Sequence, residues 1–150
     1  MSDPHNCRVI RQAEAVESTD TKQELPTFVG VSGESVGAAG ICMHLGTIPP
    51  RSVAQPHIHE GHESAIYILS GQISFYYGPD LEHLMTVGPG DFVYLGASVP
   101  HQPFNESDTE TARYIVARTD PNEQESVVVL PELWRRMANH PLTASSAAAG

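Results

Sequence analysis

From Thr27 onward, the chain consists of short apolar runs that are interrupted by turns containing Gly and Pro. The sequence holds 12 glycines and 12 prolines, and turn-forming stretches such as Ser70-Gly71 and Gly88-Pro89-Gly90-Asp91 stand between the runs. Runs bounded in this way favour β-strands, and tight turns in series favour antiparallel pairing. We therefore predict an all-β fold.

Ten short strands are predicted along this part of the chain. Because open strand edges promote aggregation, so many strands favour closure into a barrel or a double-sheet jelly roll. A sandwich without a cavity is the alternative. The predicted strands are Thr27–Val31, Ala38–Ile48, Val53–His59, Ser64–Leu69, Gln72–Tyr77, Leu84–Val87, Phe92–Leu95, His101–Asn105, Thr111–Arg118 and Ser126–Leu130.

The length of 150 residues suits one compact domain, since single hydrophobic cores serve chains of about 50 to 200 residues. Residues 1–26 are polar, and we predict an N-terminal arm with one short strand at Arg8–Arg11, followed by a barrel over 27–130. Pro131 suits the first turn of a helix, which we predict over 131–141. The small and polar residues 142–150 predict a disordered tail.

The charge of the chain excludes some partners. A formal net charge of −10 repels phosphate backbones and anionic lipid headgroups, so we expect neither nucleic acid nor a membrane as partner. No apolar run is long enough to span a membrane and the first residues do not resemble a secretory signal, which predicts a cytoplasmic protein. Cys7 and Cys42 lack the spacing of a disulfide framework and are expected to be free thiols.

The strongest local signal is a cluster of histidines and carboxylates. His57, His59 and His62 lie within six residues, next to Glu60 and Glu63. On a strand, side chains two residues apart share a face, so His57 and His59 can converge on one ion with Cα atoms roughly 6.5 Å apart. A metal site needs further ligands from elsewhere in the fold. His101 follows the rigid Val99-Pro100 pair and is the best remote candidate, whereas His5, His44, His83 and His140 are assigned no role. For His44 the alternative is that its predicted strand, Ala38–Ile48, turns it into the barrel.

Two segments also match a pair of family motifs. In the first, His57, His59 and Gly71 stand in register, and the second runs from Gly90 to His101 and Asn105, with Gly96 and Ser98 in place of the usual Pro and Gly. On these residues the chain resembles the cupin superfamily. The resemblance implies a double-stranded β-helix barrel of the jelly-roll type, with His57, His59 and His101 as ligands of one divalent metal ion.

The chain departs from this family at the carboxylate ligand. Ser64 stands where the motif has Glu, and Glu63 is one step away. If the strand is regular, residues of the same parity as Ser64 face inward, which favours His62 as the fourth ligand. A one-residue bulge near Gly61 would return Glu63 to the metal. The two candidates are kept open.

The fourth ligand bears on the chemistry. Four imidazoles leave the ion its full charge of +2, whereas one Glu reduces the charge of the site to +1. Zinc is the favoured ion, and iron, nickel or manganese are alternatives. We expect a metal-dependent enzyme that cyclises or isomerises a small carbonyl-containing or aromatic substrate, similar to zinc-dependent polyketide cyclases. A non-haem iron dioxygenase and a non-catalytic binding protein for small molecules are the other hypotheses. The resemblance implies a homodimer, in which the N-terminal arm could take part.

Overall fold

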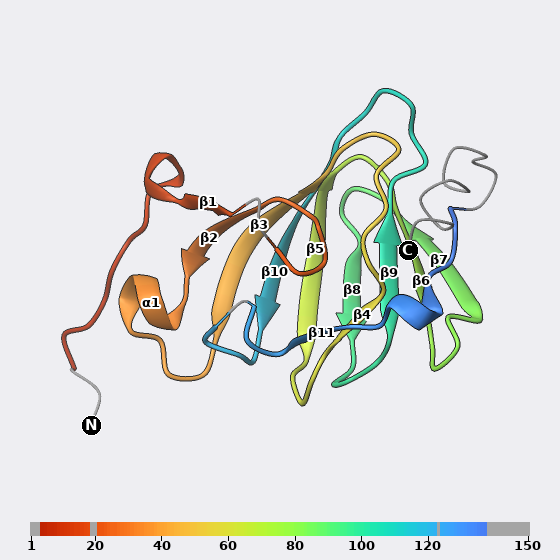
Figure 1. Ribbon diagram of the computed structural model, residues 1–150. Coiled ribbons are helices and arrows are strands. Elements are labelled where there is room, and N and C mark those ends of the chain that lie inside the picture. The colour runs from red at the N-terminus through yellow and green to blue at the C-terminus, as the bar shows by residue number, and fades with distance from the viewer. Residues whose placement is uncertain (1–3, 19–20, 123, 138–150) are drawn as a thin grey trace.

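The structure is a computed structural model that describes residues 4–18, 21–122 and 124–137. Its strands form two antiparallel sheets (Figure 1). In the six-stranded sheet the strands follow one another in the order β1 (Val16–Ser18), β2 (Thr27–Val31), β3 (Cys42–Ile48), β10 (Ala112–Arg118), β5 (Ser64–Ser70) and β8 (Phe92–Leu95). In the five-stranded sheet the order is β11 (Val127–Val129), β4 (His57–His59), β9 (His101–Phe104), β6 (Ile73–Tyr77) and β7 (His83–Val87).

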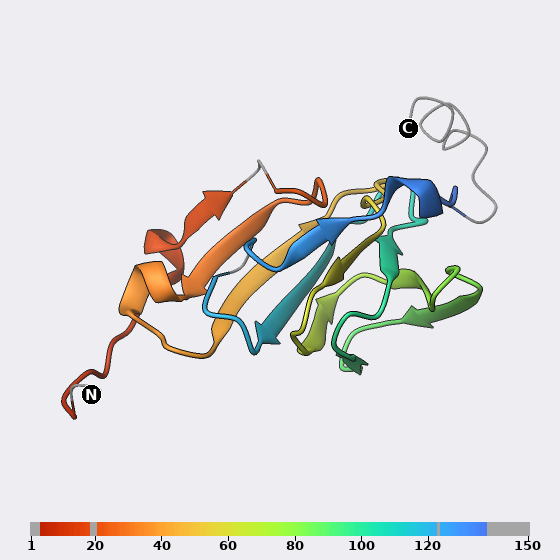
Figure 2. The ribbon, with the colours of Figure 1, turned by 60° about the horizontal axis from the view of Figure 1, so that its bottom comes forward.

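Helical structure is sparse in the described residues. One α-helical turn, α1 (Gly33–Val36), follows β2, and two 3₁₀ turns, η1 (Gln12–Glu14) and η2 (Pro131–Leu133), lie near the two ends of the chain. Both views place α1 and η2 at opposite ends of the molecule, with the sheets between them (Figures 1 and 2). No helix in these described ranges is long and apolar enough to cross a membrane.

Alternation along the strands decides which residues enter the core. In β5, Ser64, Ile66 and Ile68 are buried, and the residues between them are exposed. The partner strand β10 places Arg118 opposite Ser64 and Val116 opposite Ile66, so all four side chains lie on the inner face of the six-stranded sheet. The core between the sheets combines this face with side chains of the five-stranded sheet, such as Ile73 and Phe75.

The structure confirms the all-β prediction and most of the predicted strands. Three segments differ by several residues. The strand predicted over Ala38–Ile48 begins only at Cys42. Only His57–His59 of the segment Val53–His59 forms a strand, because Pro56 has no N–H to give to a ladder, and Val53 makes an isolated bridge to Phe104. In the arm, Arg8–Arg11 is irregular, and Val16–Ser18 pairs with β2 instead.

The C-terminal segment also differs from prediction. Instead of a regular helix from Pro131, one 3₁₀ turn is followed by irregular chain through Met137, and the rest of 131–141 and the predicted tail 142–150 lie outside the described residues. The reason is tertiary docking. The Arg135 guanidinium donates to the Leu81 carbonyl and lies over the Tyr76 ring, and Met137 is buried. These contacts hold the segment in an irregular conformation and outweigh its helix propensity.

Candidate metal centre

Three buried histidines converge between the two sheets. His57 and His59 lie two residues apart on β4 and therefore point to the same face, and His101 begins β9 directly opposite His57. One ring nitrogen from each lies within 4.8 Å of the others, and the ring centroids are 4.3 to 5.3 Å apart. The structure thus brings together the three residues that the sequence analysis singled out most strongly.

Backbone carbonyls fix the tautomers of two of these rings. His57 Nδ1 lies 2.7 Å from the Gln55 carbonyl oxygen, and His101 Nδ1 lies 2.9 Å from that of Val99. A carbonyl only accepts, so each Nδ1 carries the proton and each Nε2 keeps its lone pair. Ligand histidines in metal sites are oriented in this way. His59 Nδ1 is buried and has no hydrogen-bond partner in the described structure. Coordination of a metal ion by His59 would account for this.

Burial keeps the three imidazoles neutral. It lowers the pKa of His57 and His59 well below the ordinary value, and it lowers the pKa of His101 to about 4. The positive charge of Arg118 contributes in the same direction at each ring. A metal ion binds only the neutral ring, so the site is ready for a cation at neutral pH.

The triad lines a small cavity of about 30 Å³ inside the barrel. Its wall is apolar in large part, with Ile48, Ile66 and Phe75 among the lining residues. Three further side chains with polar groups, His44, Tyr114 and Arg118, line the cavity from the six-stranded sheet. No Asp or Glu is among the described residues that line it.

The fold and this site agree with the comparison against known families. A model of the cupin domain matches residues 44–118, which are half of the 150-residue chain and include all three histidines. The chain belongs to the cupin family.

Solved structures support the fold of this cupin. The polyketide cyclase RemF from Streptomyces resistomycificus is 19% identical, with a TM-score of 0.69 and 93% of each chain covered. An uncharacterised Klebsiella pneumoniae protein with a double-stranded β-helix domain is 14% identical, with a TM-score of 0.61, 82% of this chain and 96% of that chain covered. A variant of the oxalate decarboxylase of B. subtilis is 15% identical, with a TM-score of 0.70, and 99% of this cupin covers 38% of it. No curated protein matches the sequence.

At the position of the family's carboxylate ligand, this cupin has a serine that is hydrogen-bonded to an arginine. Ser64 points inward from the first position of β5 and is 2% exposed. Its Oγ accepts a hydrogen bond of 2.9 Å from Arg118 Nε. A negative group of the usual motif is thus replaced by a neutral group beside a positive one.

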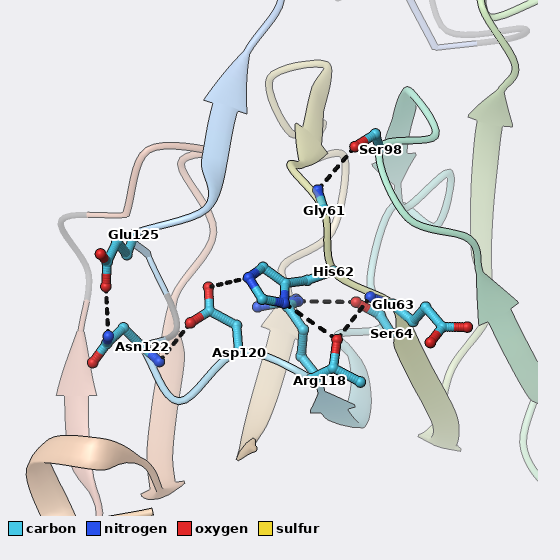
Figure 3. A network of polar contacts seen from close by, with 10 residues as sticks. Gly61, His62, Glu63, Ser64, Ser98, Arg118, Asp120, Asn122 and Glu125 are labelled. Atoms are coloured by element: carbon cyan, nitrogen blue, oxygen red, sulfur yellow. Dashed lines mark hydrogen bonds and ion pairs between the residues drawn. The ribbon is translucent and has the colours of Figure 1, made fainter. Parts of the chain in front are cut away.

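The histidine cluster does not include His62 or Glu63, the two candidates for a fourth ligand. Figure 3 shows them in a separate network of polar contacts, in which His62 is directed toward Asp120. His62 Nδ1 lies 3.3 Å from Thr119 Oγ1 and its Nε2 lies 4.0 Å from Asp120, while Glu63 accepts a hydrogen bond from the Tyr94 hydroxyl. The alternation of side chains that favoured His62 holds only within one strand. β4 ends at His59, and a turn with Gly61 at φ 74° separates it from β5. The inward direction of the Ser64 side chain therefore does not determine the direction of the His62 side chain.

Two residues near the triad, His44 and Arg118, were not predicted from the sequence to have a role. His44 is 4% exposed, its Nδ1 has no hydrogen-bond partner in the described structure, and burial with the charge of Arg118 lowers its pKa to about 3. The register of β3 and β10 sets His44 opposite Val116. His44 and Arg118 therefore both lie on the inner face. The alternation of side chains along the predicted strands was the available signal. His44 shares a strand face with the buried Ile48, and Arg118 shares one with the buried Val116.

Proposed function

We propose that this cupin is a divalent-metal-dependent enzyme that acts on a small carbonyl-containing or aromatic substrate by Lewis-acid chemistry, as a cyclase or isomerase. His57, His59 and His101 would hold the ion, and zinc is the ion we favour. The observation that carries the proposal is a cluster of three neutral imidazoles in a cavity with no carboxylate among its described lining residues. A divalent ion held there would supply a Lewis acid that polarises a carbonyl oxygen.

The charge of the site supports this chemistry over a role for the ion in structure alone. With neutral ligands, the ion would keep its full positive charge for a substrate oxygen, whereas a carboxylate ligand would reduce it. Three protein ligands are also the number that catalytic zinc sites use, with one position left for water or substrate. A polyketide cyclase is among the proteins of similar fold, although likeness at 19% identity supports the fold alone.

The chain's own residues would position and protect the substrate. The Gln55 and Val99 carbonyls orient the His57 and His101 rings. Apolar side chains such as Phe75 and Leu95 exclude water from the cavity, which strengthens each electrostatic interaction inside it. Gln23 and Leu25, in the segment before β2, complete the wall.

Metal analysis of the full chain, purified without added metal, tests the proposal. We expect about one zinc per chain in the wild type by atomic emission, and loss of nearly all of it in His59→Ala. His83→Ala is the matched control, because His83 is an exposed histidine on β7 outside the cluster, and it should keep the metal. Stoichiometric iron in place of zinc would favour the dioxygenase, and a wild-type protein that takes up no divalent metal would overturn the proposal.

We also propose that the chain forms a homodimer through the outer face of its six-stranded sheet. Register partners place five apolar side chains in one row across five strands, and this outer row consists of Phe28, Leu45, Ile115, Tyr67 and Phe92. Phe92 is 83% exposed. A row of this kind can pack against its own copy about a two-fold axis, as sheets do in sandwiches.

Phe92→Lys tests the dimer. The variant should elute and scatter light as a monomer at a concentration where the wild type is a dimer, because two lysines would face each other across the interface. Leu84→Lys, exposed on β7 of the other sheet, should leave the mass unchanged. A monomeric wild type would contradict this proposal and leave the metal site untouched.

A further inference from the structure

One side chain stands between the triad cavity and solvent. Among the described residues that line the cavity, Tyr114 alone is partly exposed, and all the others are buried. Its side chain comes from the middle of β10 and packs against the hydrophobic core between the sheets. Tyr114 thus contacts the cavity on one side and solvent on the other, which places it at the entrance.

The ring of Tyr114 lies over a glycine of the neighbouring strand. Gly46 of β3 is the register partner of Tyr114, and β3 and β10 run side by side in the six-stranded sheet (Figure 1). Gly46 is on the same strand face as His44 and Ile48, which line the cavity. The Tyr114 ring therefore lies on the cavity side of the sheet.

This close approach explains the glycine. A Cβ atom at Gly46 would lie 2.6 Å from Tyr114 Cε1 and closer still to Cζ and Oη, well inside the roughly 3.5 Å at which carbon atoms pack. Gly46 is not among the described glycines with a positive φ, so the position requires a small residue and not an unusual backbone. The absence of a side chain at Gly46 thus determines where the Tyr114 ring can lie.

The cavity behind the ring has room for only a few atoms. Its volume of about 30 Å³ is roughly the room of two or three water molecules. Pockets that enclose drug-sized ligands measure about 300 to 1,000 Å³. An aromatic substrate would need Tyr114 to move aside before it reached the triad, whereas a molecule of a few non-hydrogen atoms would not.

We propose that Tyr114 selects the ligands of the cavity by size, so that the substrate is a small carbonyl compound of a few non-hydrogen atoms and not an aromatic one. Gly46 is a positioning residue, since it acts through the Tyr114 ring. The choice of substrate class rests on the proposed metal-dependent function, whereas closure of the cavity by Tyr114 does not.

Chemical modification of the metal-free full chain tests the closure. Diethyl pyrocarbonate attacks neutral imidazoles, and mass spectrometry of peptides gives its rate of reaction at each histidine. In Tyr114→Ala we expect His59 and His101 to react at least about tenfold faster than in the wild type, because the reagent no longer waits for a local opening. The exposed His83 is the internal control, and its rate should be the same in both proteins.

Two matched variants separate the ring from other effects. Tyr114→Phe keeps the ring and removes only the hydroxyl group, so the triad should react as slowly as in the wild type. Ile68, the register partner of Tyr114 on β5, is buried in the core and is not among the residues that line the cavity. Ile68→Ala should therefore lose packing without opening the entrance. An equal acceleration in Ile68→Ala, or triad rates that Tyr114→Ala leaves unchanged, would overturn the closure.

Gly46→Ala tests the same claim if Tyr114→Ala does not fold. The added methyl group displaces the Tyr114 ring, so the triad should react faster than in the wild type. In the Tyr114→Ala background, the same substitution should add nothing, because it has no ring to displace. A Gly46→Ala variant whose triad reacts as slowly as that of the wild type would contradict the proposal.

Two hydroxamic acids, which bind zinc through the same group, test the selection by size. Acetohydroxamic acid has a methyl group where benzohydroxamic acid has a phenyl ring. In calorimetry on the zinc-loaded full chain, the wild type should bind acetohydroxamate at least about tenfold more tightly than benzohydroxamate. Tyr114→Ala should lose this preference, and Tyr114→Phe should keep it. Equal binding of the two acids to the wild type, or a preference that Tyr114→Ala retains, would overturn the selection.

The outcomes separate this proposal from the metal-dependent function. A chain that takes up no zinc contradicts that function and the substrate class, while the modification rates still decide whether Tyr114 closes the cavity. A chain that binds zinc, but whose triad reacts equally fast with and without the Tyr114 ring, keeps the metal function and loses the selection by size.

Discussion

Each face of the six-stranded sheet departs from the usual pattern in one place. The inner face is mainly apolar, but near the triad it carries three buried polar side chains, His44, Ser64 and Arg118. The outer face carries the apolar outer row, in which Tyr67 and Phe92 pack ring against ring at 4.9 Å. In an ordinary sheet with one wet face, polar residues point out and apolar residues point in. Burial of polar groups is costly, so the buried polar side chains support the proposed site on the inner face, and the exposed apolar row supports the proposed dimer contact on the outer face.

The largest effect should come from protonating the inner face. Burial lowers the pKa of His44 to about 3 and that of His101 to about 4, below their unfolded values. Their contribution is therefore complete above about pH 6.5 and is lost as the pH falls toward 4. We expect the free energy of unfolding of the metal-free protein to fall by about 2 kcal/mol for each buried histidine between pH 7.5 and pH 5, and so by about 8 kcal/mol for His44, His57, His59 and His101 together.

Urea unfolding at the two pH values measures this loss. His44→Phe keeps an aromatic ring without a titrating group. The free energy lost between the two pH values should therefore be smaller by about 2 kcal/mol, the contribution of one histidine. The exposed His83→Ala should not change it. Equal stability at both pH values would show that the inner face does not hold neutral histidines.

A smaller effect should separate neighbouring residues of one strand. Ile66 faces the core from β5, and Tyr67 is the next residue on the outer face. Ile66→Ala should lower the free energy of unfolding by about 2 to 5 kcal/mol, because it leaves a cavity in the core. Tyr67→Ala should lower it by less than about 1 kcal/mol when measured on the monomer. Comparable losses in the two variants would mean that the outer face is not open in the monomer.

The smallest effect is expected beyond the end of the inner face. His62 lies in the turn between β4 and β5 and faces Thr119 and Asp120. His62→Ala should therefore change the zinc content and the zinc affinity by less than about twofold, and the free energy of unfolding by about 0.5 kcal/mol or less. Glu63→Ala should behave in the same way. Loss of zinc in either variant would place a fourth ligand in this turn.

Local patterns predicted most of the fold. The strand Thr27–Val31 was predicted at its observed bounds because its apolar residues and flanking turns are contiguous in the sequence. His57 and His59 were predicted to share a face because alternation within one strand needs no tertiary information. The C-terminal segment was not predictable in this way, since Arg135 and Met137, which dock it in an irregular conformation, contact distant residues.

The site was predictable only as far as its motifs extend. Ser64 was recognised as a departure from the family motif, but the arginine bonded to it comes from β10, 54 residues further along the chain. The position of His44 beside Arg118 likewise depends on the pairing of β3 with β10. Such pairings follow from the sheet order, which a single sequence does not specify.

The strand that carries two of the three histidines is completed late in the chain. β4 shares only one register pair with β9, whereas all three of its residues pair with β11. During synthesis, His57 and His59 leave the ribosome about 70 residues before Val127–Val129, so their strand lacks its main partner through almost half of translation. We therefore expect the triad to assemble late in folding, and a nascent chain arrested before β11 should not yet hold an ordered site.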